Sequence, residues 1–257
     1  MREFICFIRL VQRDLYILKS YFFQFLIEGG IAAGCFYLLY ACFLPAMGMT
    51  PRFVPAMFMG SLVSNMIPVI FSSLQQVAID LEKHRYIEYI ATLPISNALI
   101  ILRFILSMTL GTLICWIPVC GCGALLFHAF LRESPGSLST FLIIAFLLLF
   151  AVCAITTAIV FFFSYTWFNS YMWVCGLMPL IFFGCEIVPW RDAYRVAPYL
   201  ATLFLLNPVT YGIEGMRSVI TGSPHYIPTS VCIPVLLLWS FIGYFGALYS
   251  FNKRMGR

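Results

Sequence analysis

Long apolar runs, almost free of charged residues, recur along this chain and limit what it can fold into. Five of them cover residues 21–43, 54–79, 100–127, 139–164 and 231–251. Each reaches the ~20 residues that an α-helix needs to cross the hydrocarbon core of a bilayer. A transmembrane β-barrel would instead alternate apolar and polar residues within segments of about ten. The sequence therefore predicts an all-α polytopic membrane protein.

A sixth span is predicted over residues 171–188, although this run is shorter and is interrupted by Pro179. Only 10% of the residues are charged and the mean hydropathy is +0.97, so a water-soluble globule is excluded. Residues 196–206 are apolar over only ~11 positions, a length typical of a re-entrant or interfacial piece. Counting that piece as a span would give seven.

The distribution of basic residues favours six spans over seven. Lysine and arginine in short loops prefer the cytoplasmic side of a membrane. Six spans place three basic groups on that side, at 2–19, 83–85 and 253–257, and leave both termini cytoplasmic. We therefore expect residues 189–228 to form an external re-entrant region containing two short half-helices, broken at Asn207-Pro208.

Residues 1–20 show the pattern of an amphipathic interface helix. At ~100° per residue the polar side chains fall on one face and the apolar ones on the opposite face. Such a helix can anchor the chain passively in the membrane surface, or it can dock near a soluble partner and transmit motion to the first span. The polar face contains Arg2, Arg9, Arg13 and Ser20, and the apolar face contains Phe4, Phe7, Ile8, Val11, Leu15 and Leu18.

The loop 80–94 is predicted to be a short charged helix that Pro94 ends. Arg85 and Glu88 stand at pairing distance along it. Tyr86, Ile90 and Leu93 form an apolar stripe. That stripe either packs against the chain's own helices or contacts a soluble protein.

Polar residues within the predicted spans are costly and need an explanation. Glu28 precedes Gly30 and Gly34, which form a small-xxx-small pattern that allows close helix approach. The second span has a polar face, and its residues serve either interhelical hydrogen bonding or a translocation pathway. We name Ser61, Asn65 and Ser72 from that face, with Glu28, Gly30 and Gly34, as candidates for a pathway or dimer interface.

The tract 207–217 carries polar residues between the last two apolar runs. Asparagine, proline, glutamate and arginine at membrane depth each cost energy unless protein or a wet cavity surrounds them. Glu214 and Arg217 stand at i,i+3 and are predicted to pair in a stabilising rather than chemical role. A charge-swapped double mutant is then expected to recover function that the single mutants lose.

These features together resemble the ABC-2 type transport permeases, the membrane subunits of ATP-binding-cassette exporters. The resemblance spans residues 1–257 as a single transmembrane domain. One motif is similar to the family's coupling helix and contains Glu82, Tyr86, Glu88, Leu93 and Pro94. The other looks like the family's NP-x-x-Y...E-x-x-R signature and contains Asn207, Pro208, Tyr211, Glu214 and Arg217.

The resemblance implies a subunit of an exporter in a bacterial inner membrane, which moves an amphipathic, lipid-like, glycan-linked or drug-like substrate. It implies a homodimer paired through the first and fifth spans, a separate ATPase subunit that binds ATP and Mg, and an external gate formed by the second motif. This chain has no G-x-x-x-x-G-K-[ST] loop and no cofactor of its own is expected. The implied ATPase-coupling residues are Glu82, Lys83, Arg85, Tyr86, Glu88, Ile90, Leu93 and Pro94.

Two functions from other classes are alternatives to this one. An enzyme is disfavoured because no G-x-S-x-G or H-E-x-x-H motif is present, so no catalytic or metal-ligating residues are assigned. No nucleic-acid partner is expected, because a net charge of +5 fits basic loops beside anionic lipids. An ion-coupled secondary transporter using Glu28 and Glu186 stays open as the alternative.

Overall fold

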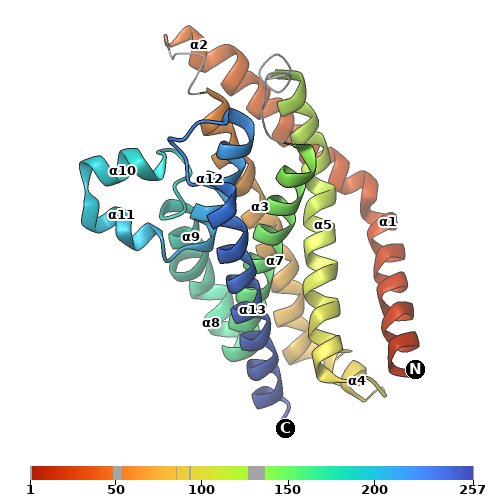
Figure 1. Ribbon diagram of the computed structural model, residues 1–257. Coiled ribbons are helices and arrows are strands. Elements are labelled where there is room, and N and C mark those ends of the chain that lie inside the picture. Colours follow the sequence, from red (N-terminus) through yellow and green to blue (C-terminus); the bar gives the residue numbers. More distant parts are fainter. Residues whose placement is uncertain (1, 49–53, 85, 93, 127–136, 257) are drawn as a thin grey trace.

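The structure, a computed structural model, describes residues 2–48, 54–84, 86–92, 94–126 and 137–256. Within these ranges the chain is a bundle of helices and contains no strand, which confirms the predicted all-α class (Figure 1). Long helices run roughly side by side through the whole height of the molecule. A pair of short helices projects from one flank (Figure 1).

Five helices among the described residues are long and apolar enough to cross a membrane. Their close correspondence to the five longest apolar runs supports a membrane protein. They are α1 (Arg2–Tyr37), α3 (Val54–Ile79), α5 (Asn97–Leu126), α7 (Leu138–Phe162) and α13 (Thr229–Arg254).

The sixth predicted span, residues 171–188, is not among these five helices. The chain there forms α8 (Tyr165–Tyr171), a π-helical stretch (Met172–Leu177) and α9 (Met178–Phe182), and then turns. Pro179 stands at the start of α9, and the helix ends well before Val188. The count of six spans is therefore not confirmed and stays a prediction.

Helix α7 lies at the centre of the bundle and packs most closely against α13. A Cβ added at Gly243 of α13 would lie 2.9 Å from the Cβ of Ala154 on α7, closer than real side chains come. Small residues let two helices approach in this way, and van der Waals packing then stabilises the pair inside a bilayer. This close crossing provides a rigid core against which the shorter elements pack.

The N-terminal segment does not form a separate interface helix. Helix α1 runs without a break from Arg2 to Tyr37, so the predicted boundary near residue 20 is not an end of a helix. The helix passes along α5 and buries Asp14 against it. One continuous helix therefore joins the N-terminal amphipathic segment to the first candidate span, Phe22–Tyr40.

Both termini and α4 (Tyr86–Ala91) lie at one end of the bundle, at the bottom of Figure 1. Helix α2 (Leu44–Ala46) lies at the opposite end, and the projecting short helices are in that half of the molecule. This arrangement has the relative placement that the basic residues predict. The assignment of the lower end to the cytoplasm remains a prediction.

The predicted charged helix over 80–94 is shorter than expected. Helix α3 continues into a π-helical turn (Asp80–His84), and α4 covers only six residues. The Asp80 carboxylate accepts a hydrogen bond from the backbone N–H of Ile87 at 2.9 Å and holds α4 against the end of α3. Ile90 is buried inside the chain, which agrees with the alternative that this residue packs against the chain's own helices.

Other residues predicted for coupling are placed only in part. Glu82 and Pro94 are exposed, and Glu82 accepts a hydrogen bond from the backbone N–H of Tyr165 at 2.9 Å, at the start of α8. Arg85 and Leu93 lie outside the described residues, as do the side chains of Lys83, Tyr86 and Glu88.

Candidate functional site

The polar tract 207–217 forms the start of α12 (Pro208–Thr221), a helix buried against α7, α13 and α3. Asn207 is the N-cap, since its side-chain oxygen accepts a hydrogen bond from the backbone N–H of Val209 at 2.9 Å. Pro208 occupies the first turn, where a missing N–H does no harm. Gly222, with φ of 61°, ends the helix in the left-handed conformation that glycine tolerates best.

The predicted break at Asn207-Pro208 is present, but three short helices occupy the region instead of two. Helices α10 (Trp190–Val196) and α11 (Pro198–Phe204) precede the break and form the hairpin that projects on the left of Figure 1. The side chain of Trp190 ties them together, because its indole N–H donates to the carbonyl of Ala201 at 2.8 Å. The hairpin is thus a small unit attached to the bundle through α12 and the segment before α10.

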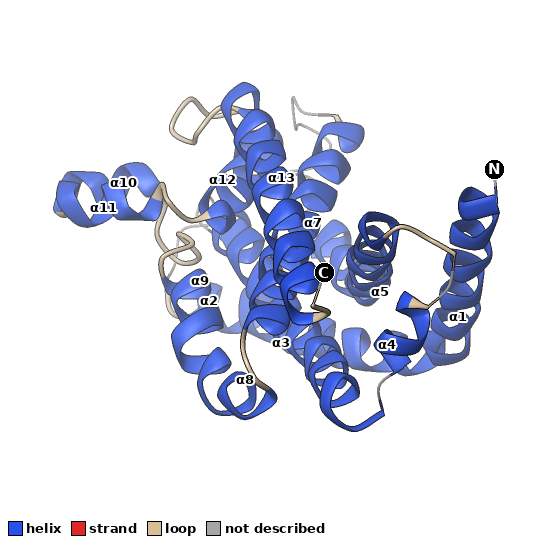
Figure 2. Cartoon of the chain, turned by 90° about the horizontal axis from the view of Figure 1, so that it is seen from below, coloured by secondary structure: helices blue, strands red, loops and turns tan. Residues whose placement is uncertain are grey.

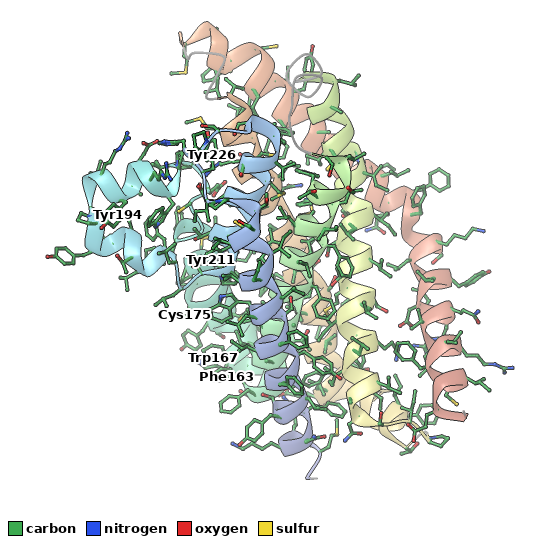
Figure 3. All side chains as sticks on the ribbon, in the orientation of Figure 1. Phe163, Trp167, Cys175, Tyr194, Tyr211 and Tyr226 are labelled. Atoms are coloured by element: carbon green, nitrogen blue, oxygen red, sulfur yellow. The ribbon has the colours of Figure 1, made fainter. Side chains whose placement is uncertain are left out.

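Four polar residues of the tract lie on one stripe of α12 and its cap, because they follow one another at helical spacing. They are Asn207, Thr210, Glu214 and Arg217. All four are buried, and all four make hydrogen bonds with the backbone of residues 180–190. We call this group the α12 clamp. Tyr211 lies off the stripe and packs, half-buried, against the hydrophobic core (Figure 3).

The N-terminal half of the α12 clamp, Asn207 and Thr210, satisfies carbonyl groups at the end of α9. The last carbonyls of a helix have no partner within it and need one elsewhere. The side-chain amide of Asn207 donates to the carbonyl of Leu180 at 2.8 Å. The Thr210 hydroxyl lies 2.7 Å from the carbonyl oxygen of Phe204 and 3.1 Å from that of Phe183. The clamp therefore joins the ends of α9 and α11 to the start of α12.

Glu214 and Arg217 form the predicted i,i+3 ion pair, with 3.0 Å between the Arg217 Nη1 and Glu214 Oε1 atoms. Both side chains are completely buried. The guanidinium also donates to the carbonyls of Cys185, at 2.8 Å, and Glu186, at 2.5 Å. Glu214 Oε1 accepts a longer bond, 3.3 Å, from the backbone N–H of Trp190. The predicted pairing is confirmed. Both side chains also form hydrogen bonds with backbone groups.

Desolvation makes this buried pair costly to break. Taking one partner away leaves the other as an uncompensated charge, which destabilises a protein by about 3–5 kcal/mol. Cys185 adds strain at the same point, because its φ of 58° lies in a region that a residue with a Cβ rarely adopts. The bond from Arg217 to the Cys185 carbonyl helps to hold that conformation.

Helix α3 packs against the backbone of Glu186, which the α12 clamp also holds. A Cβ added at Gly60 would lie 1.9 Å from the carbonyl oxygen of Glu186, the oxygen to which Arg217 donates. Only a glycine fits there. The next residue, Ser61, hydrogen-bonds the hydroxyl of Tyr40 near the end of the first span. Two candidate spans, the 183–189 segment and α12 therefore meet at one point.

The α12 clamp has a structural role. Apart from the ion pair, its hydrogen bonds run to the backbone, and none of the four clamp residues lines the cavity of about 450 Å³ that lies beside it, between α10 and α11. That cavity is mostly apolar, with Glu186 and Asp192 as its charged residues. The clamp thus fixes the hairpin's attachment to the bundle, while a role as an external gate stays a prediction.

The residues predicted for a pathway or dimer interface are not brought together with the clamp, except Ser61. Glu28 is exposed and accepts a hydrogen bond from Gln24 at 3.0 Å. An added Cβ at Gly30 or Gly34 would meet nothing within 4 Å, so that side of α1 is open. Ser72 is exposed and donates to the carbonyl of Val69 one turn earlier, and Asn65 is partly buried.

Sequence analysis missed a second buried ion pair, which joins α1 to α5. Arg103 Nη2 lies 2.8 Å and Arg103 Nε 2.5 Å from the carboxylate of Asp14, to which Ser107 donates at 2.8 Å. Burial alone would raise the pKa of Asp14, but Arg103, with Ser107 and Arg13, outweighs it and lowers that pKa below its ordinary value. Arg103 inside an apolar run was the available signal, and its partner 89 positions away was not.

Comparisons with known proteins add no relative: no family model, no curated protein and no solved structure matches this chain.

Proposed function

We propose that this chain is the membrane-spanning permease subunit of an ABC exporter, powered by ATP hydrolysis in a separate subunit. It acts as a homodimer in a bacterial inner membrane with both termini in the cytoplasm. Its substrate class is amphipathic and includes lipid-like, glycan-linked and drug-like molecules. The chain binds no cofactor itself, and ATP and Mg belong to the partner.

The α12 clamp carries the proposal. A completely buried Glu214–Arg217 pair on a helix that starts at Asn207-Pro208 is an expensive arrangement in a chain of this composition. Asn207, Pro208, Glu214 and Arg217 of this arrangement match the family's signature. A buried ion pair alone would not distinguish a transporter class, but here it supports a projecting hairpin beside membrane-length helices, in the order that the family predicts.

Coupling to the partner is assigned to the end of the bundle that holds α4 and both termini. Tyr89 is exposed on α4, and Glu82 and Pro94 are exposed beside it. Asp80 fixes α4 to α3, so a push on α4 is transmitted to α3 and, through Gly60, to the segment that the clamp holds. This gives a continuous mechanical connection between the proposed ATPase surface and the proposed gate.

Affinity purification of the tagged chain in mild detergent tests the partner directly. We expect an ATP-binding subunit to copurify and to hydrolyse ATP. Tyr89→Asp adds a charge to the exposed surface of α4 and is expected to reduce the recovered ATPase severalfold, because it weakens docking without touching the core.

Tyr199→Asp is the matched control. Tyr199 is also strongly exposed, but it lies on α11 in the other half of the molecule. Its variant should retain the partner. Equal loss in both variants, or full retention in both, would reject the α4 surface, and absence of any ATPase from wild type would reject the proposed function.

A further inference from the structure

A second cavity, of about 340 Å³, lies near the C-terminus where α7 and α13 end. Its apolar wall consists of three consecutive phenylalanines, Phe161 to Phe163, and its polar wall contains Ser164, Ser250, Lys253 and Arg254. It is therefore aromatic on one side and cationic on the other. The ATP-dependent transport proposed above makes no use of it.

Both cations are held in place by their surroundings. Arg254 Nη1 donates to the carbonyls of Phe163 at 2.9 Å and Val160 at 3.3 Å, at the end of α7. The ammonium of Lys253 lies 5.0 Å from the centre of the Phe162 ring. Among the described residues no carboxylate pairs with either cation or lines this cavity, so the two positive charges are uncompensated there.

The cavity lies at the boundary of the apolar zone. The two candidate spans that form it end at Phe162 and Arg254. Phe163 stacks on Trp167 with 3.8 Å between ring centres, and Trp167 in turn lies near Tyr171 (Figure 3). Aromatic rings of this kind are enriched at the level of lipid headgroups.

We propose that this cavity binds the headgroup of an anionic phospholipid. Lys253 and Arg254 attract the phosphodiester, the serine hydroxyls can hydrogen-bond its oxygens, and an acyl chain lies along the exposed ring of Phe162. A soluble phosphate would use the cations but not the aromatic wall. The position at the end of two spans therefore favours a lipid.

Binding is measured on the full-length chain in detergent, by titration with short-chain phosphatidylglycerol and with phosphatidylcholine of the same chain length. Wild type is expected to prefer phosphatidylglycerol, because the choline of phosphatidylcholine offsets the charge of its phosphodiester. Lys253→Gln should raise the Kd for phosphatidylglycerol roughly fivefold, since one surface cation contributes about that factor, and should raise the Kd for phosphatidylcholine less. Lys19→Gln, an exposed cation on α1, is the matched control and should change nothing.

Arg254→Lys keeps the charge but removes the Nη1 group that donates to the last carbonyls of α7, so its unfolding temperature without lipid is measured alongside binding. Lys253→Gln has no such structural role and keeps the test independent of folding. Inorganic phosphate competing as well as the lipid would assign the cavity to a soluble anion and overturn the proposal. Equal affinity for both lipids, or an equal effect of Lys19→Gln, would overturn it as well.

Discussion

Arg217 combines three structural roles. It neutralises Glu214, holds two carbonyls of the 183–189 segment and, through one of them, supports the strained backbone at Cys185. A residue with that many buried partners is hard to replace even by another cation, because lysine lacks the planar fork that reaches several acceptors at once.

Arg217→Met is therefore predicted to destabilise the chain by about 3–5 kcal/mol, because it leaves Glu214 charged and buried without its partner. Thermal unfolding of the purified protein in detergent measures this as a large drop in Tm. Arg195→Met is the control, since Arg195 forms an exposed pair with Asp192 that is worth less than about 1 kcal/mol. Equal effects of the two variants would contradict the clamp.

The backbone partners also revise the expectation for a charge swap. Glu214→Arg with Arg217→Glu would place a carboxylate against the carbonyl oxygens of Cys185 and Glu186, and a guanidinium against the N–H of Trp190. Both contacts are repulsive, so the double variant should stay as unstable as the single ones. Recovery of the wild-type Tm would mean that the pair acts independently of the 183–189 segment.

Gly60→Ala is predicted to be strongly destabilising, since its Cβ would overlap the carbonyl oxygen of Glu186 and this backbone atom cannot move without breaking its bond to Arg217. Gly121→Ala is the matched variant in another membrane-length helix, where an added Cβ meets nothing within 4 Å. Its stability should stay unchanged or rise slightly. Comparison of the two Tm values checks the prediction.

At the scale of elements, the attachment of α1 to α5 depends on charge. The Asp14–Arg103 pair joins it to α5, and the pKa of Asp14 is lowered in the folded chain. A lowered carboxyl pKa contributes stability that is complete above the unfolded value and is lost as pH falls through the folded value. The contact between α1 and α5 should accordingly weaken in acid.

Asp14→Asn is predicted to lower the Tm at neutral pH, because Arg103 is left buried without its counter-charge, and to flatten the fall of Tm as the pH drops below about 4. Arg9→Gln, which changes an exposed cation of the same helix, should keep the wild-type slope. A wild-type slope in Asp14→Asn would show that other carboxylates control the acid response.

The elements also show what a sequence can and cannot reveal. Continuous apolar runs predicted α3, α5, α7 and α13 to within a few residues, because a bilayer-length run has few alternatives to a helix. The π-helical stretch over 172–177 and the burial of Ile90 depend on tertiary packing, which local patterns do not encode.

For the candidate site, the sequence predicts the side-chain pairing but not the backbone partners. The i,i+3 spacing was enough to pair Glu214 with Arg217, and the spacing of Asn207 and Thr210 relative to them could have identified the whole stripe. The partners of that stripe are backbone carbonyls at 180, 183, 185 and 186, and nothing in a sequence says which carbonyls a fold leaves unpaired.

For the whole molecule, the proposed dimer places a second copy against the side of the bundle that α1 and α8 flank. Seen from below, α1 and α8 lie on either side of α3 (Figure 2), so a two-fold partner can bring the α1 of one copy to the α8 of the other. Gly30 and Gly34 are open on α1, and Cys35 beside them is exposed.

In this arrangement the two copies of Cys35 do not face each other directly, so a variant that keeps Cys35 as its single cysteine is predicted to be joined into a dimer in membranes by a bismaleimide with a long spacer and not by direct oxidation. The control carries Phe241→Cys as its single cysteine, on an exposed position of α13. It should remain monomeric on a non-reducing gel. Cross-linking of the control alone would place the interface on α13 instead.

We propose that transport by this chain is driven by ATP in a partner and not by an ion gradient. Proteoliposomes that contain the chain alone, or the chain with its copurified subunit, test it through ATP hydrolysis and through a pH-sensitive dye. We predict hydrolysis only with the subunit present, and no proton flux from the chain alone. Proton flux through the chain alone, abolished by Glu28→Gln or Glu186→Gln and independent of ATP, would contradict the account and establish an ion-coupled carrier.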